Sequence, residues 1–442
     1  MLENILMNLP EVKGPLQKRL GFKEKLKWTS IVLMGFFLLG VVPLYGLSEN
    51  ALSQFEFLSI ILGAKFGSII SLGIGPLVTS SIVLQLLNGS GIINFDLTTA
   101  DGKRKFQAIQ KVLSIFFIVF EALIYVFMGG LSPSSALAPN AYLTMQLVLV
   151  GQLIVGGVVI MFMDEIIQKW GFGSGISLFI AAGVSSEIII RAFSPLTTAG
   201  TLAFGSSQDA IGKVWVLIQS LSGGNPAGAI LALSAILATI LVFCFAVYGQ
   251  AMKVEIPLSF GRIRGHGIRW PLNFIYTSNI PVILIAALLA NIQLWARLLE
   301  KWGYPLFGTF SGNTPASGLV MWIASPNLVE KIITGGIVGS DFLHSLVYVA
   351  IMVCGAIMFS IFWVQTAGMD AKSQAKQMLS SGLQIPGFRR DQRVLESILN
   401  RYIFPLTVMG GALVGFLAAG ADLMGALSNG TGILLAVMII YR

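Results

Sequence analysis

Ten runs of mostly apolar residues divide the chain, and shorter stretches richer in polar residues separate them. About 20 apolar residues are needed for an α-helix to cross the hydrocarbon core of a bilayer. We therefore predict ten transmembrane helices, at roughly 28–47, 68–89, 108–130, 142–163, 174–194, 227–252, 273–295, 343–366, 403–424 and 428–442. The last run is short for a crossing, since about fifteen residues of helix reach only about 22 Å, and we expect further chain beyond its end.

Two short patterns each occur twice along these runs. The sequences GSGI (173–176) and GTGI (430–433) each open an apolar run, and Pro76 and Pro281 each interrupt another run. If the ten runs form two sets of five, the proline-containing helix is second and the glycine-led helix fifth in each set. An odd number of crossings inverts the second set relative to the first. The predicted fold is an all-α polytopic membrane protein with two inverted five-helix halves around a central pore.

Basic residues decide the predicted orientation. Lysines and arginines gather before the first run and after the second, fourth, sixth and eighth runs. Positively charged loops usually stay in the cytoplasm, so both termini are expected there. The resulting division is a cytoplasmic N-terminal segment with a short amphipathic helix (1–27), a first half (28–226), and a second half (227–442) with cytoplasmic loops at 253–269 and 367–402.

Composition agrees with a membrane protein and disfavours a catalyst. Hydrophobic residues make up 55% of the 442 residues and charged residues 11%, which is more apolar surface than a soluble chain of this length can bury. The two cysteines, Cys244 and Cys354, lie in apolar runs, where we expect buried, unpaired thiols. No zinc spacing, Walker loop or nucleophile elbow occurs. We expect no enzymatic activity, no metal and no cofactor.

Branched aliphatic side chains mark the proline-containing and glycine-led helices. In the first half they come in pairs four residues apart, so each pair shares one helix face. A narrow neck lined by such side chains excludes water and ions by dewetting. Ordinary packing within membrane helices would explain the same spacing. The candidate positions are Ile74, Val78, Ile176, Ile180, Ile283 and Leu435.

Longer motifs add a family resemblance. The stretches SIISLGIGPLVTSSIVLQLL (68–87) and DEIIQKWGFGSGISLF (164–179) resemble the two signature segments of the SecY family of protein-conducting channels. The likeness covers essentially the whole chain and is closest to the archaeal and eukaryotic branch. Further matching segments are 253–265, 276–295, 387–391 and 430–435.

The resemblance implies the central pore-forming subunit of the Sec protein translocase. Such a subunit passes unfolded secretory polypeptides across the cell (plasma) membrane and releases transmembrane segments sideways into lipid. The implied partners are a SecE-type subunit, a small third (beta-type) subunit, the ribosome, signal peptides, nascent polypeptides and membrane lipid.

The resemblance also implies roles for particular residues. The six aliphatic positions above correspond to the pore ring. A plug is implied at 56–66, with Glu56, Phe57, Leu58, Ile60, Ile61, Leu62, Gly63 and Phe66. A lateral gate is implied at Thr79, Glu121 and Asn291. Ribosome docking is implied at Arg262, Arg264, Arg389 and Arg390.

Two other classes of membrane protein stay open on the residues alone. A secondary transporter also has inverted repeats and broken helices, but it needs a polar site for substrate and coupling ion, for which Glu121 is nearly the only candidate. A membrane scaffold explains the hydrophobicity but not the repeated proline and glycine patterns.

Overall fold

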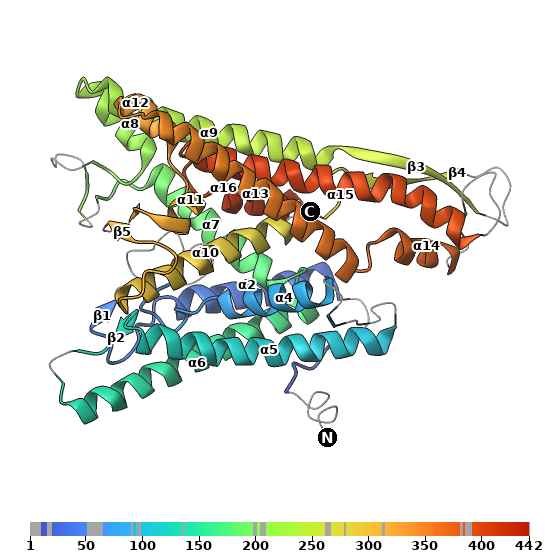
Figure 1. Ribbon diagram of the computed structural model, residues 1–442, viewed down its shortest axis with the longest axis horizontal. Helices are drawn as coiled ribbons and strands as arrows, with labels where there is room; N and C mark the ends of the chain where they lie inside the picture. The colour runs from blue at the N-terminus through green and yellow to red at the C-terminus, as the bar shows by residue number, and fades with distance from the viewer. Residues whose placement is uncertain are drawn as a thin grey trace.

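The computed structural model describes most of the chain (Figure 1). The described residues are 10–15, 20–50, 65–89, 92–93, 95, 99–134, 137–197, 201–203, 209–260, 267–277, 280–311, 314–380, 383–384 and 391–441. Residues 1–9, which hold most of the predicted amphipathic N-terminal helix, lie outside this set.

Each of the ten predicted spans corresponds to a helix. These helices are α2 (Phe22–Leu39), α4 (Gly75–Gly89), α5 (Ala100–Phe127), α6 (Pro139–Trp170), α7 (Gly175–Phe193), α9 (Pro226–Ala251), α10 (Ile280–Lys301), α13 (Gly339–Thr366), α15 (Gln392–Leu423) and α16 (Gly430–Tyr441). Seven of them, all except α2, α4 and α16, are long and apolar enough to cross a membrane. Four shorter helices lie in the connections: α8 (Lys213–Ser222), α11 (Gly318–Ile323), α12 (Leu328–Thr334) and α14 (Ala371–Ser380).

The long helices form two groups with two helices between them. In Figure 1, α2, α4, α5 and α6 lie together in the lower part of the molecule, and α9, α13, α15 and α16 lie together in the upper part. Helices α7 and α10 run between the groups. The largest buried apolar cluster takes side chains from both groups and from both intervening helices, so the core of the protein lies where the two groups meet.

The two repeated prolines begin helices and do not break them. Pro76 and Pro281 are each the second residue of their helix, α4 and α10. Residues 68–74, predicted as part of the second span, form turns instead. Proline fits the first helical turn because it has no N–H group to satisfy there and its φ angle already suits a helix. The only proline past the first turn of a described helix is Pro405, in α15.

Part of the predicted cytoplasmic loop at 253–269 is a β-hairpin. Strand β3 (Lys253–Phe260) pairs antiparallel with β4 (Gly267–Asn273), and β7 (Leu383–Gln384) adds to the free edge of β3. Ile256 and Leu272 are buried against α14 and α15, whereas Glu255 and Arg269 are exposed and form an ion pair. Strand β4 ends at Asn273, which is the first residue of the predicted seventh span. Helix α10 begins only at Ile280.

Two further short β pairs lie in connections. Strand β1 (Glu49–Asn50) pairs antiparallel with β2 (Leu131–Ser132). Strand β5 (Phe310–Ser311) pairs antiparallel with β6 (Thr314–Pro315).

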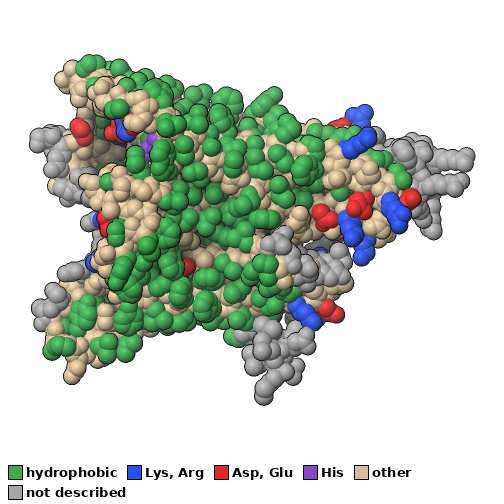
Figure 2. All heavy atoms as spheres, in the orientation of Figure 1, with side chains coloured by type: hydrophobic (Ala, Val, Ile, Leu, Met, Phe, Trp, Pro, Cys, Tyr) green, Lys and Arg blue, Asp and Glu red, His purple; other side chains and the backbone are tan. Residues whose placement is uncertain are grey.

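The outer surface is apolar along the middle of the helices and charged near the ends. Figure 2 shows a wide band of hydrophobic side chains, with charged side chains gathered mainly at the end where α14 and the hairpin lie. Cys244 and Cys354 are unpaired but exposed, so the prediction that they are buried is wrong. In a membrane protein the outward helix faces meet lipid, and an apolar run therefore does not imply burial inside the protein.

Close helix packing depends on particular glycines. A Cβ atom on Gly156 of α6 would lie 2.0 Å from the carbonyl oxygen of Ile69, whereas a Cβ on Gly151 of the same helix would meet nothing within 4 Å. Replacing Gly156 with alanine should cost about 1–3 kcal/mol through overpacking against backbone that cannot rotate away. Gly151→Ala should be neutral or stabilise by up to about 1 kcal/mol, because alanine favours helix. Thermal unfolding of both variants in lipid nanodiscs checks this, and equal unfolding temperatures would contradict it.

Candidate functional site

The six predicted ring residues lie in one apolar cluster. Their helices are α4, α7, α10 and α16, with Ile74 in the turn directly before α4. Five of the side chains are between 1% and 6% exposed, and Ile176 is half-buried and packs against the same cluster. The structure therefore brings together residues that are spread over more than 350 positions of the sequence.

Each ring residue lies at or near the beginning of its helix. Ile74 precedes α4 and its carbonyl accepts the N–H of Val78 at 3.0 Å. Ile176 is the second residue of α7, and Ile283 is the fourth residue of α10. Four helices thus begin close to one apolar cluster inside the protein. A helix start has N–H groups without partners in the helix, so this arrangement needs other acceptors or residues that lack the donor.

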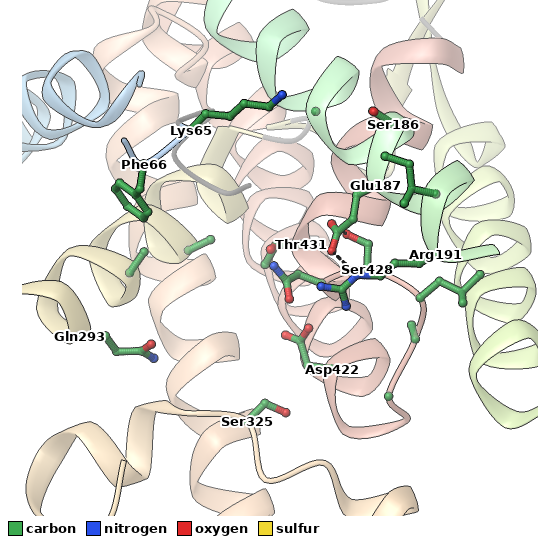
Figure 3. A pocket seen from close by; sticks show the side chains of 18 of the residues that line it. Lys65, Phe66, Ser186, Glu187, Arg191, Gln293, Ser325, Asp422, Ser428 and Thr431 are labelled. Atoms are coloured by element: carbon green, nitrogen blue, oxygen red, sulfur yellow. Dashed lines mark hydrogen bonds and ion pairs between the residues drawn. The ribbon is translucent and has the colours of Figure 1, made fainter. Parts of the chain in front are cut away.

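A large cavity lies beside the ring. Its volume is about 1610 Å³, and it is lined by parts of α7, α10, α13 and the connection from α15 to α16. Its described lining includes none of the six ring residues, which lie in the large apolar cluster instead. Figure 3 shows its polar groups: Glu187 forms an ion pair with Arg191 at 2.8 Å and accepts a hydrogen bond from the Ser428 hydroxyl at 2.6 Å.

Most of the predicted plug lies outside the described residues. This holds for Glu56, Phe57, Leu58, Ile60, Ile61, Leu62 and Gly63. Phe66 is described and lines the cavity, where its ring lies 6.4 Å from that of Tyr125. Gly67 directly after it has φ +94°, a backbone conformation that favours glycine.

The three predicted gate residues form one hydrogen-bonded group. Asn291 Nδ2 of α10 donates to Thr79 Oγ1 of α4 at 3.1 Å. The Thr79 hydroxyl in turn donates to Glu121 Oε1 of α5 at 3.3 Å. The Thr79 hydroxyl also donates to the Gly75 carbonyl within its own helix, at 2.9 Å. Of these three bonds, the one between Asn291 and Thr79 joins α10 to α4.

This group is buried but incompletely satisfied. Glu121 is 3% exposed and Asn291 8% exposed. Glu121 Oε2 and Asn291 Oδ1 have no hydrogen-bond partner among the described residues. An unmade bond in an apolar surrounding is costly, so these polar atoms hold α4, α5 and α10 together less firmly than a fully paired network would.

The predicted ribosome-docking arginines also lie outside the described residues. Arg262 and Arg264 fall between β3 and β4, and Arg389 and Arg390 fall between β7 and α15. The described strands that flank them are adjacent, because Phe260 at the end of β3 pairs with Leu383 of β7. The two basic segments therefore each follow a strand of the same small sheet in the sequence.

The N-terminal segment is bound to the ends of α5 and α6. Val12 donates its backbone N–H to Glu165 at 3.0 Å, and Glu165 also forms an ion pair with Lys111. Lys169 pairs with Glu11 and holds the pKa of that carboxyl below its usual value, mainly through the hydrogen bond between them. These contacts were not predicted, because they join residues that lie far apart in the sequence.

Two acids that bond to the start of the following helix were also not predicted. Asp164 of α6 is buried, and Asp422 of α15 is half-buried and lines the cavity; both lie within apolar runs. The signal available in the sequence was their presence in predicted spans, since an ionisable residue there is a functional candidate by default.

Comparison with known proteins identifies the family. The SecY family matches residues 68–442. The chain is 42% identical to the protein translocase subunit SecY of Methanococcus vannielii, over 100% of this chain and 94% of that protein. It is also 42% identical to the same subunit of Methanocaldococcus jannaschii, over 99% of this chain and 93% of that protein.

Solved structures agree with the sequence comparison. One, described as the structure of a protein conducting channel, superposes with a TM-score of 0.82 at 41% identity and covers 100% of this chain and 95% of that one. Another, Sec61 in the canine ribosome-channel complex from the endoplasmic reticulum, superposes with a TM-score of 0.79 at 39% identity and covers 100% and 95%. With its ten membrane helices and this likeness along its whole length, the chain belongs to the SecY family of protein-conducting channels.

Proposed function

We propose that this chain conducts unfolded secretory polypeptides across a membrane through the apolar ring and releases hydrophobic segments sideways into lipid. The observation that carries the proposal is that six aliphatic side chains from four helices, two in each half of the sequence, join one buried cluster beside a large cavity.

The ring would act as a seal when no polypeptide is present. Branched aliphatic side chains offer no hydrogen bond to water or to an ion, so a narrow passage between them stays dry. The same side chains have no group that would bind a passing chain strongly. A seal made only of packing contacts can therefore open around many different sequences and close again after them.

The seam between α4 and α10 would serve as the lateral exit. Helix α4 contacts α10, which lies between the two groups, and α13 of the other group. The bond between Asn291 and Thr79 is the polar contact of the gate group that joins α4 to α10. A Leu-like residue gains about 0.3–0.6 kcal/mol in lipid, whereas a central Asp, Lys or Arg costs about 2.5–3.5 kcal/mol. Each segment can therefore leave or stay according to its own composition.

Partners and orientation belong to the same proposal. The basic segments beside β3 and β7 would face the cytoplasm and dock the ribosome through Arg262, Arg264, Arg389 and Arg390, which would place both termini in the cytoplasm. The canine Sec61 channel, to which this chain is similar, belongs to a complex with the ribosome, and that likeness supports the assignment. A SecE-type and a small beta-type subunit would complete the complex in the cell membrane, with residues 56–66 as the plug.

A transporter is less well supported. It requires buried polar groups that are free to bind a substrate or an ion. Asp164 and Asp422 instead accept hydrogen bonds from backbone N–H groups at helix starts. Membership of the channel family also favours conduction of polypeptides.

Polar substitution in the ring should make the resting channel leak. Ile180→Asn or Ile283→Asn places an amide in the dry neck, where it can hold water. A barrier lowered by about 1.4 kcal/mol raises ion flux about tenfold. The measurement is ion release from lipid vesicles that contain the full chain. Ile180→Leu, which keeps the neck apolar, is the control and should not leak; equal flux in the Asn and Leu variants would contradict the seal.

Removal of the bond across the seam should ease lateral exit. Asn291→Leu deletes a membrane hydrogen bond of about 1 kcal/mol, which equals the lipid gain of about two or three Leu-like residues. A test segment with two or three fewer Leu-like residues should then still enter lipid. Glycosylation or protease mapping of model segments measures this. Ser114→Ala is the matched control, because it removes the 2.7 Å bond to Ser80 within the first group of helices. A threshold shifted equally by both variants would count against a gate at Asn291.

A further inference from the structure

Two aspartates, one in each half of the chain, face the start of the next helix: Asp164 is buried, and Asp422 is half-buried and lines the large cavity. Asp164 is near the end of α6 and faces the start of α7, and Asp422 is near the end of α15 and faces the start of α16. Helices α7 and α16 are the two glycine-led helices that carry Ile176, Ile180 and Leu435 of the ring.

Each carboxylate accepts hydrogen bonds from the backbone at the start of the next helix. Asp164 Oδ1 accepts the N–H of Ile176 at 3.0 Å. Asp422 Oδ1 accepts the N–H of Gly430 at 2.7 Å. Thus the backbone of one ring residue, Ile176, is itself held by an acid from the preceding helix.

The second oxygen of each acid is also engaged. Asp164 Oδ2 accepts from Gln168 Nε2 at 2.7 Å within α6. Asp422 Oδ2 accepts from the Tyr348 hydroxyl of α13, also at 2.7 Å. With both oxygens bonded, each carboxylate has one orientation, and the helix start that it holds is fixed relative to the preceding helix.

The local N-cap residue does not perform this role at α7. Ser174 stands at the N-cap position and has a suitable hydroxyl, but its side chain makes no capping bond. Gly175 and Gly430, the first residues of the two helices, are buried, although exposed residues precede α7 and the large cavity adjoins the start of α16. An acid at the positive end of a helix is also favoured by the helix dipole.

Glycine lets each pair of helices approach closely enough for the bond. A Cβ on Gly175 would lie 2.7 Å from Cα of Asp164, and a Cβ on Gly430 would lie 2.0 Å from the carbonyl oxygen of Ala418 in α15. Both distances are too short for a side chain, so glycine and aspartate together make the contact.

The two contacts lie toward opposite ends of the bundle. Helix α15 starts where the hairpin and α14 lie and runs away from them, whereas α6 runs toward the end nearer the N-terminal segment (Figure 1). Asp422 itself lies beside the large cavity, near Ser428 and Thr431 (Figure 3). The ring helices α7 and α16 are therefore anchored from opposite sides, as an inverted repeat requires.

We propose that Asp164 and Asp422 are a symmetric pair of positioning residues, which fix the rotation and height of α7 and α16 so that their aliphatic side chains close the ring. A helix turns about 100° and rises about 1.5 Å for each residue of slippage, and even one residue would move Ile180 or Leu435 out of the neck. This inference rests on the proposed sealing function of the ring.

The test compares alanine variants with a matched cap elsewhere. Asp164→Ala and Asp422→Ala, each in the full chain in lipid vesicles, should raise resting ion release at least about tenfold, which corresponds to about 1.4 kcal/mol. Asp391→Ala removes the same residue type from the N-cap of α15, where it accepts the Arg393 N–H at 2.9 Å and no ring residue follows. It should lower the unfolding temperature without a leak.

Conservative variants separate positioning from general stability. Asp164→Asn and Asp422→Asn keep one oxygen for the backbone N–H and should restore a tight channel. Tyr348→Phe removes only a hydroxyl, folds even if an alanine variant does not, and should leak to a smaller extent through a loosened Asp422. The proposal would be overturned if the two alanine variants leak no more than Asp391→Ala. If Asp422→Ala does not fold, a Tyr348→Phe channel that does not leak would overturn it instead.

Failure of this inference can be told apart from failure of the seal. If Ile180→Asn leaks and the aspartate variants do not, the ring seals but is positioned by other contacts. If Ile180→Asn does not leak, the ring does not seal, and the positioning role is overturned with it.

Discussion

Helices that begin at the apolar core of the protein set the central constraint on this structure. The first N–H groups of a helix have no partner within it, and in a membrane interior no solvent replaces that partner. Four helices begin at or near the ring, α4, α7, α10 and α16. The chain meets the constraint in two ways. Proline near the start of α4 and α10 removes a donor, and aspartate from a neighbouring helix accepts the donors of α7 and α16.

The ring and the seam differ in the kind of contact that closes them. The ring consists of aliphatic side chains in a dense apolar cluster, so it can separate and close again without breaking hydrogen bonds. The seam between α4 and α10 includes a few polar atoms, of which some lack partners among the described residues. Opening the seam exposes those atoms to new partners and compensates part of the broken bond, which suits a contact that has to part.

The family assignment and the geometry support each other. The likeness to SecY proteins extends over the whole chain, and the described residues place the ring, the gate group and the cavity close together. In the proposed mechanism, the aspartates Asp164 and Asp422 would keep α7 and α16 in register.

The sequence by itself determined the number of long apolar helices, and its family motifs predicted the ring and gate residues. Hydrophobic length and residue spacing are local properties, so each of the ten predicted spans corresponds to a helix. The family motifs predicted roles for Ile74, Thr79 and Asn291 from their positions in the sequence. Only the tertiary structure decided where the helices begin, that residues 253–260 pair with residues 267–273, and that Asp164 and Asp422 bond to two helix starts. Ser428 and Glu187, 241 positions apart, meet in the cavity for the same reason. Such contacts depend on which distant segments pack together, and no local pattern of apolar and polar residues contains that information.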